Sequence, residues 1–206
     1  GRLVVNVSAD PVEGGTAGGG SAWKRMNPAV FNHVRALAHG GDRLYAGTSD
    51  TTYRGVYRCD DPTSETPAWT LIGLQDKDVF SLAWDGTRLY AGTNAGVYRC
   101  GNPEADSPAW DPINSGELGN HRVTSLFFDG TRLYAGTFTG GVFRCADPTS
   151  DIPAWSRIGP GNDWVSSLVW DGTRLYAGTC NRGVFRCADP GSDDPTWEAI
   201  NQGISS

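Results

Sequence analysis

Four acidic side chains that could act as general acids or bases lie in the variable segments of the sequence: Asp76, Asp78, Glu117 and Asp163. Hydrolysis of a glycosidic bond needs two carboxyl groups close to each other on either side of that bond, and no spacing in the sequence pairs these four. The chain also lacks a Gly-x-Ser-x-Gly nucleophile motif, a phosphate-binding loop and a His-Glu-x-x-His metal motif. We therefore predict that the protein is not an enzyme and needs no cofactor.

Five cysteines and three histidines are the residues that could form disulfides or bind a metal. Four cysteines recur at one position of a sequence repeat, so a whole structural unit separates each from the next, whereas a disulfide needs Cα atoms within about 7 Å. A bridge between the extra Cys180 and Cys187 is a minor alternative. No histidine has metal-ligand spacing to a cysteine. We predict buried, reduced cysteines and no metal site. The sequence does not decide the localisation, although reduced cysteines and the lack of a signal peptide favour the cytoplasm.

A repeat of about 41 to 45 residues organises the sequence. The string DGTRLYAGT occurs unchanged three times, and a weaker copy, GDRLYAGT, precedes them at Gly41–Thr48. Each copy is followed by GVYRC or GVFRC and, ten residues after that cysteine, by a tryptophan. Because these tryptophans keep one spacing, we predict that they pack between units: Trp69, Trp110, Trp155 and Trp197.

Each repeat contains four short segments typical of β-strands. In the second copy they are Val79–Trp84, Arg88–Thr93, Gly96–Cys100 and Pro108–Ile113. The Asp-Gly pair between the first two predicts a two-residue hairpin turn with positive φ at both residues. Four antiparallel strands per repeat are typical of a β-propeller blade. We predict an all-β protein: a β-propeller built of four-stranded antiparallel blades, with four complete repeats plus an extra N-terminal strand.

The ends of the chain leave the closure of the ring open. Ser21–Met26 resembles a tryptophan strand, although the last repeat already has its own, and Gly14–Gly20 is a glycine-rich linker. We therefore divide the chain into an N-terminal extension with linker (1–20) and the propeller repeats (21–206). Three arrangements fit: a closed four-bladed ring with a spare strand, a partial fifth blade built from both ends, or a fragment that joins another copy to complete a larger ring.

The repeat resembles the blades of Asp-box and related regulator-type bacterial propellers, which are neuraminidase-repeat-like. The residues that carry the resemblance are V-x-S-L-x-W-D-G-T-R-L-Y-A-G-T-x-x-G-V-Y-R-C. Two features depart from it, because cysteine stands where serine is usual and the turn to the tryptophan is longer. Such propellers include sialidases, other glycosidases, lectins and sensor domains, so the resemblance implies the fold but not the function. A sialidase needs a cluster of arginines, whereas we predict that the repeated arginines pair with acids inside their own blades: Arg88, Arg132 and Arg174.

Charge and hydropathy exclude two classes of partner. The formal net charge is −6, whereas a nucleic-acid-binding protein normally presents a basic face to the phosphates. The sequence contains no run of eighteen apolar residues, about the length that a membrane-spanning helix needs. We predict no nucleic-acid partner and no membrane association.

The variable loops indicate where a ligand would bind. Loops on one face of the repeats keep their length, whereas the second-to-third-strand loops and the loops between repeats differ in length and in residue type. We expect this variable face to form the mouth of the central channel, with six ligand-binding candidates: Arg35, Tyr53, Phe80, Arg122, Phe138 and Trp164.

Aromatic and arginine side chains are the residue types that dominate binding surfaces. We therefore predict a non-catalytic recognition or sensor module that binds a macromolecular partner at its variable face. A carbohydrate-binding lectin is the first alternative. A ligand-free repeat scaffold, or a propeller fragment that forms a homo-oligomer, is the second. The expected ligand is thus a protein or a glycan.

Overall fold

The computed structural model describes residues 33–159 and 161–203. The predicted extension (1–20) and the predicted extra strand at Ser21–Met26 lie outside the described residues. Among the described residues, no helix has the length and apolar character needed to cross a bilayer. All regular elements that the structure describes are β-strands. They are β1 (Val34–Gly40), β2 (Arg43–Thr48), β3 (Gly55–Cys59), β4 (Thr70–Gly73), β5 (Val79–Trp84), β6 (Leu89–Thr93), β7 (Gly96–Cys100), β8 (Asp111–Pro112), β9 (Ser115–Gly116), β10 (Val123–Phe128), β11 (Leu133–Thr137), β12 (Val142–Cys145), β13 (Ala154–Gly159), β14 (Val165–Trp170), β15 (Leu175–Thr179), β16 (Gly183–Cys187) and β17 (Trp197–Ala199).

The strands form four antiparallel sheets in chain order, one for each repeat, which confirms the predicted blades. We number them blade 1 (β1–β4), blade 2 (β5–β8), blade 3 (β10–β13) and blade 4 (β14–β17). Two details differ from the prediction. The outer strand β8 covers only residues 111–112, where Pro112 has no N–H to donate to a ladder. The short strand β9 pairs parallel with β13, since Gly116, at φ 83°, lets the loop approach the backbone of Trp155.

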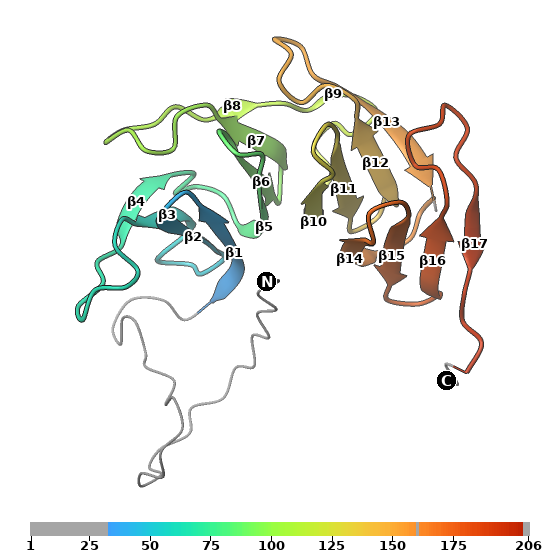
Figure 1. The fold of residues 1–206 in the computed structure, drawn as a ribbon, viewed down its shortest axis with the longest axis horizontal. Helices are drawn as coiled ribbons and strands as arrows, with labels where there is room; N and C mark the ends of the chain where they lie inside the picture. The colour runs from blue at the N-terminus through green and yellow to red at the C-terminus, as the bar shows by residue number, and fades with distance from the viewer. Residues whose placement is uncertain (1–32, 160, 204–206) are drawn as a thin grey trace, which may run out of the picture.

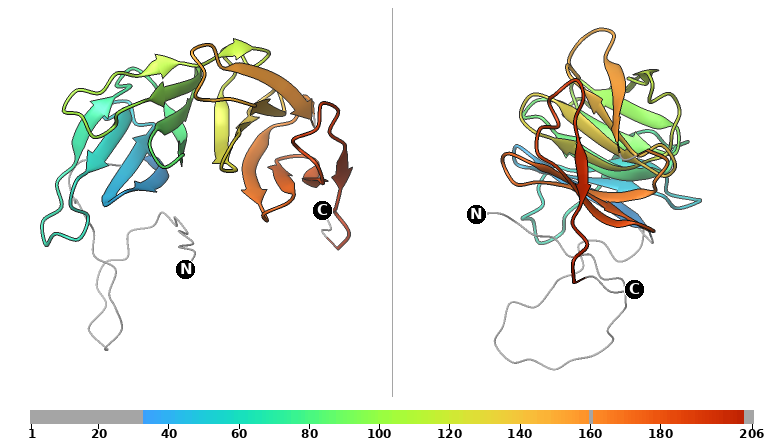
Figure 2. Two further views of the ribbon diagram at one scale, coloured as in Figure 1. Left: turned by 45° about the horizontal axis from the view of Figure 1, so that its top comes forward. Right: turned by 90° about the vertical axis from the view of Figure 1, so that its right-hand side faces the viewer.

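The blades follow one another along a curved arc (Figure 1). Their first strands, β1, β5, β10 and β14, pack against each other in that order on the concave side. Blades 1 and 4 do not meet, and an opening separates them (Figure 1; Figure 2, left). The described residues are therefore not arranged as a closed four-bladed ring, the first of the three arrangements considered above. The rotation from one blade to the next, set by the side chains packed between them, is too small for four blades to complete a circle.

The Asp-Gly turns differ from the predicted two-residue hairpins. Between β5 and β6 the loop covers residues 85–88, and Gly86 has positive φ whereas Asp85 does not. The Asp85 carboxylate instead accepts the backbone N–H groups of Thr87 and Arg88, at 2.8 and 2.6 Å, and the Tyr90 hydroxyl at 2.9 Å. The Asp85 carboxylate thus accepts the backbone N–H groups that a backbone carbonyl would accept in a tighter turn. The same contacts recur around Asp129 and Asp171.

The repeated arginines of these turns form ion pairs with the aspartates of their own blades, as predicted. The ion pairs are Arg88–Asp85 at 3.6 Å, Arg132–Asp129 at 3.8 Å and Arg174–Asp171 at 3.4 Å. The backbone N–H groups of Arg174 and Thr173 lower the pKa of Asp171 to about 2, because they stabilise its charged form. Each arginine pairs with the aspartate of its own turn, and the three do not gather into a substrate clamp.

Aromatic side chains fill the space between consecutive blades. Three outer-strand tryptophans donate their indole N–H to an isoleucine carbonyl of the preceding blade, 38 to 42 residues earlier in the chain: Trp110 to Ile72 at 2.9 Å, Trp155 to Ile113 at 2.6 Å and Trp197 to Ile158 at 2.6 Å. Tyr45 of blade 1 stacks on Trp84 of blade 2, with ring centroids 5.9 Å apart. Each of the three buried clusters combines residues of neighbouring blades. This confirms the predicted packing of Trp110, Trp155 and Trp197 between units.

An arginine of the third strand, buried in blades 1 and 3 and half-buried in blade 2, joins each of these blades to the next. The Nη1 atom of Arg58 donates to the carbonyls of Pro103 and Ala105 in the following blade, at 2.9 and 2.8 Å. The equivalent donations run from Arg99 to Pro148 and Ser150, and from Arg144 to Pro190 and Ser192. Hydrogen bonds from a charged donor are stronger than neutral ones. We call this repeated contact the arginine link.

The cysteines are free thiols, and the four repeated ones are buried whereas Cys180 is exposed. Burial raises the pKa of the Cys100 and Cys145 thiols to about 11, and it also raises those of Cys59 and Cys187. Since the thiolate is the reactive form, we expect one fast-reacting thiol in the native protein and all five only after unfolding. Titration with a chromogenic disulfide reagent measures this. A Cys180→Ser variant should abolish the fast phase, and a fast phase that survives it would contradict the predicted burial.

Candidate functional site

A register irregularity occurs at the start of the first strand in each of the four blades. Pairing with the second strand skips one residue in each blade: Arg35, Phe80, Thr124 and Ser166. Such an irregularity re-aims a side chain that regular alternation would place differently. Phe80 therefore lies beside the segment that leads into β10, where Arg122 directly precedes the strand.

Four of the six predicted ligand-binding residues form one continuous surface. The guanidinium carbon of Arg122 lies 4.0 Å from the ring centroid of Phe80 and 5.4 Å from that of Phe138. The Phe138 ring lies 4.7 Å from that of Trp164, tilted by 51°. These contacts cross from blade 2 through blade 3 to blade 4. We call Phe80, Arg122, Phe138 and Trp164 the aromatic–arginine strip.

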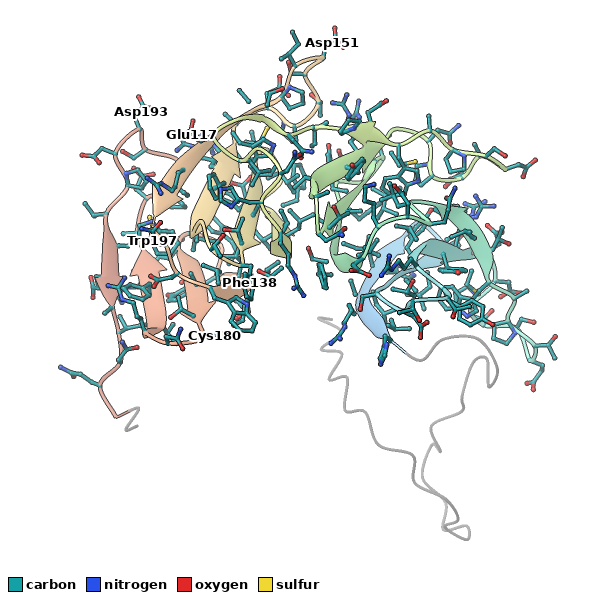
Figure 3. All side chains as sticks on the ribbon, turned by 180° about the vertical axis from the view of Figure 1, so that it is seen from behind. Glu117, Phe138, Asp151, Cys180, Asp193 and Trp197 are labelled. Carbon is teal, nitrogen blue, oxygen red and sulfur yellow. The ribbon has the colours of Figure 1, made fainter. Side chains whose placement is uncertain are left out.

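The strip is held in place but remains accessible. The backbone N–H of Phe138 donates to the carbonyl of Arg122 at 2.9 Å, which fixes the two segments side by side. Phe138 is 37% exposed and Trp164 is 42% exposed. Among the described residues no carboxylate forms an ion pair with Arg122. The guanidinium carbon lies over the Phe80 and Phe138 rings, and the guanidinium N–H groups are donors that a ligand could use. Figure 3 shows Phe138 on the concave side of the arc.

Two predicted residues, Arg35 and Tyr53, lie in blade 1, apart from the strip. The Arg35 Nε atom donates to the Ser49 hydroxyl at 2.9 Å. Tyr53 is 36% exposed, and its backbone carbonyl accepts the Thr48 hydroxyl. The structure thus brings together Phe80, Arg122, Phe138 and Trp164 and leaves these two apart from them.

The four acidic candidates are each bound by another group. Asp78 pairs with Arg54 at 3.0 Å and Asp163 with Arg182 at 2.9 Å, while Lys77 pairs with Asp76. The Glu117 carboxylate accepts the backbone N–H of Arg157 at 2.8 Å, and Figure 3 shows Glu117 at the outer rim, away from Phe138. Glu117 directly follows β9, which pairs with β13 at the outer edge of its sheet.

Sequence reasoning did not select the neighbours of the strip in blade 3. The Thr139 hydroxyl lies 3.4 Å from the Nδ1 atom of His121, and the His121 ring lies 5.5 Å from that of Phe143. Both polar residues belong to variable loops, which is the signal that could have included them. Within the described ranges, no group of three or more histidine, cysteine or acidic residues has the geometry of a metal site.

No protein-family model matches the sequence, and neither does any curated protein. Solved structures do match. The beta-propeller domain of Myceliophteria thermophila Cps50 (Swd1) superposes with a TM-score of 0.56 at 14% identity, over 78% of this chain and 54% of that one. The fold is a β-propeller. The extracellular domain of the B. thetaiotaomicron one-component system BT4673 reaches a TM-score of 0.65 at 20% identity, over 87% of this chain and 24% of that one.

A Niastella koreensis GH74 enzyme is also similar, with a TM-score of 0.60 at 18% identity over 77% of this chain and 28% of that one. The chain thus spans about half of the Swd1 domain and about a quarter of the BT4673 and GH74 chains. At these identities the similarity shows the shared propeller fold, and a fold hosts many functions.

Proposed function

We propose that the protein is a non-catalytic recognition module that binds a protein partner through the aromatic–arginine strip. The observation that carries this proposal is the exposed pair Phe138 and Trp164 next to an arginine without a carboxylate partner in the described chain. Tryptophan and arginine are the residue types that contribute most at protein interfaces. Aromatic rings that already contact each other lose little conformational freedom when a ligand binds.

The chemistry of the strip defines a class of ligand. Its rings offer apolar contact, and the edge of the Arg122 guanidinium offers donors to a carboxylate or a backbone carbonyl. Asp163, which directly precedes Trp164 in the sequence, is paired with Arg182. We therefore propose an extended segment that places an apolar or aromatic side chain beside an acidic one.

The absence of catalysis is part of this proposal. Asp76, Asp78 and Asp163 are each ion-paired, so the variable face offers no free pair of carboxyl groups for glycoside hydrolysis among the described residues. Similarity to a GH74 enzyme covers only 28% of that protein. We also assign the repeats to the Asp-box-like class, which the turn aspartates Asp85, Asp129 and Asp171 support.

Selection from a random peptide library displayed on phage tests the proposed ligand class, with a glycan array probed in parallel. We expect enriched peptides that combine aromatic and acidic residues, and no selective glycan binding. Selective binding to one glycan class would instead favour the lectin alternative, because an exposed tryptophan also stacks on sugars. If neither the peptide library nor the glycan array gives a selectively bound ligand, recognition at this surface is contradicted.

Replacing Trp164 by alanine is expected to weaken binding of the selected peptides by about 30-fold or more, as for a central interface residue. Titration calorimetry on synthetic peptides measures the change. Ile152→Ala is the matched control, because Ile152 is 76% exposed and lies in a loop of the outer rim that contains Asp151 (Figure 3). Equal affinities of the wild type and the Trp164 variant would place the binding site elsewhere.

A further inference from the structure

The two ends of the arc carry complementary halves of the contact that joins consecutive blades. We call the side of blade 1 that points away from blade 2 the head face, and the side of blade 4 that points away from blade 3 the tail face (Figure 1). Three blade-to-blade interfaces repeat the same contacts, so each half can be identified by its position in the repeat. No blade precedes blade 1 or follows blade 4 in the part of the chain that the structure describes.

At the tail face, the arginine of the link has no following blade in the described chain to which it could donate. Arg186 is the equivalent of Arg58, Arg99 and Arg144, and its guanidinium pairs with Glu198 of its own blade at 2.5 Å. At the head face, Pro62 and Ser64 occupy the loop positions whose carbonyls accept this link in the other blades. A tail face placed against a head face would therefore form a fourth arginine link.

A glycine–valine contact shows the same complementarity. In blades 1 to 3 a second-strand glycine lies directly against a valine of the next blade, so that an added Cβ would come within 2.5 to 2.6 Å of it: Gly47 with Val79, Gly92 with Val123 and Gly136 with Val165. At the tail face, Gly178 has only serines of its own blade nearby. At the head face, Val34 is half-buried, whereas its three equivalents are fully buried.

Apolar side chains are exposed on both faces where inner blades bury them. Val169 on the tail face is 59% exposed, whereas Ala83 at the equivalent position of blade 2 is 7% exposed. Leu37 on the head face is 38% exposed, whereas Leu126 and Leu168 are each 9% exposed. Exposed apolar surface at the end of a repeat array favours association with another unit, because terminal repeats normally carry a polar outer face.

We infer that a second copy of this chain docks its tail face onto the head face of the first, continuing the blade sequence across the junction. A second copy is the occupant that supplies both halves with the residues and spacing already used at three internal interfaces. The interface is heterologous, so two copies close a ring if the rotation fits, and otherwise a head-to-tail chain grows. The inference concerns assembly and is independent of the ligand proposed for the strip.

Sedimentation velocity of the full chain tests this between about 1 and 200 µM, a range in which mass action reveals weak association. We expect a species of at least twice the monomer mass. Val169→Asp on the tail face and Leu37→Asp on the head face should each give a monomer with an unchanged circular dichroism spectrum. Ile152→Asp, an equally apolar but outlying position, should associate as the wild type does.

Mixing the two variants provides the decisive measurement. An equimolar mixture of Val169→Asp and Leu37→Asp retains one intact tail face and one intact head face, so it should form a dimer that neither variant forms alone. A monomeric wild type over the whole concentration range would overturn the inference. Association that survives either substitution, or a mixture that stays monomeric, would also overturn it, because each would place the contact on another surface.

Discussion

Replacing Trp155 by alanine is expected to lower the free energy of unfolding by about 3–5 kcal/mol, the range for a fully buried aromatic residue. Trp155 is 1% exposed and is part of the cluster that joins blades 2 and 3. Its indole N–H donates to the Ile113 carbonyl at 2.6 Å. The substitution therefore removes a large apolar side chain and leaves a carbonyl of the neighbouring blade without its donor. Urea unfolding followed by circular dichroism measures the loss.

Two further variants separate the causes of this loss. Trp155→Phe keeps most of the apolar volume but removes the N–H, so it should cost only about 1–2 kcal/mol. Trp197→Ala removes the equivalent residue of blade 4, which is only half-buried. Its cost should be smaller than that of Trp155→Ala. Equal costs at the two positions would mean that packing between blades 2 and 3 is not what stabilises the arc.

The number and order of the blades can be predicted from the sequence because every repeat carries its own strand signals. For example, the ten-residue spacing from cysteine to tryptophan is the same in every repeat. In blade 3 it places Cys145 on β12 and Trp155 on β13, where the two residues pair across the sheet. The Asp-Gly turns were harder to predict. The tighter turn competes with side-chain capping, and the carboxylate of Asp85 accepts two backbone N–H groups that a two-residue turn would satisfy otherwise.

Closure of the ring could not be predicted, because it depends on the rotation between blades, which no single repeat encodes. The candidate site is likewise predictable only where the signal lies within a single repeat. Position in the variable loops was enough to select Phe138 and Trp164, whose rings do meet. Which loops come together depends on contacts between blades, so Arg35 and Tyr53 could not be separated from the strip. The parallel pairing of β9 with β13 could not be predicted either, because among the described residues it occurs in one repeat only.

Replacing Arg144 by methionine is expected to lower the free energy of unfolding by about 2–3 kcal/mol, since a buried hydrogen bond from a charged donor contributes about 1.5–3 kcal/mol. Arg144 is 9% exposed and donates to the Pro190 and Ser192 carbonyls, at 2.9 and 2.5 Å. Methionine retains the apolar stem but cannot reach those carbonyls as a donor. The substitution therefore weakens the contact between blade 3 and blade 4.

Hydrogen exchange measured by mass spectrometry should locate this effect. In a linear array each unit contacts only its neighbours, so amides of blade 4 should exchange faster in the Arg144 variant while those of blade 1 keep the wild-type rate. Arg174→Met is the control, because this arginine is exposed and pairs within its own turn, and it should change neither stability nor exchange. A uniform increase across all four blades would mean that the arc unfolds as one cooperative unit. In that case the arginine link would stabilise the whole arc and would not act blade by blade.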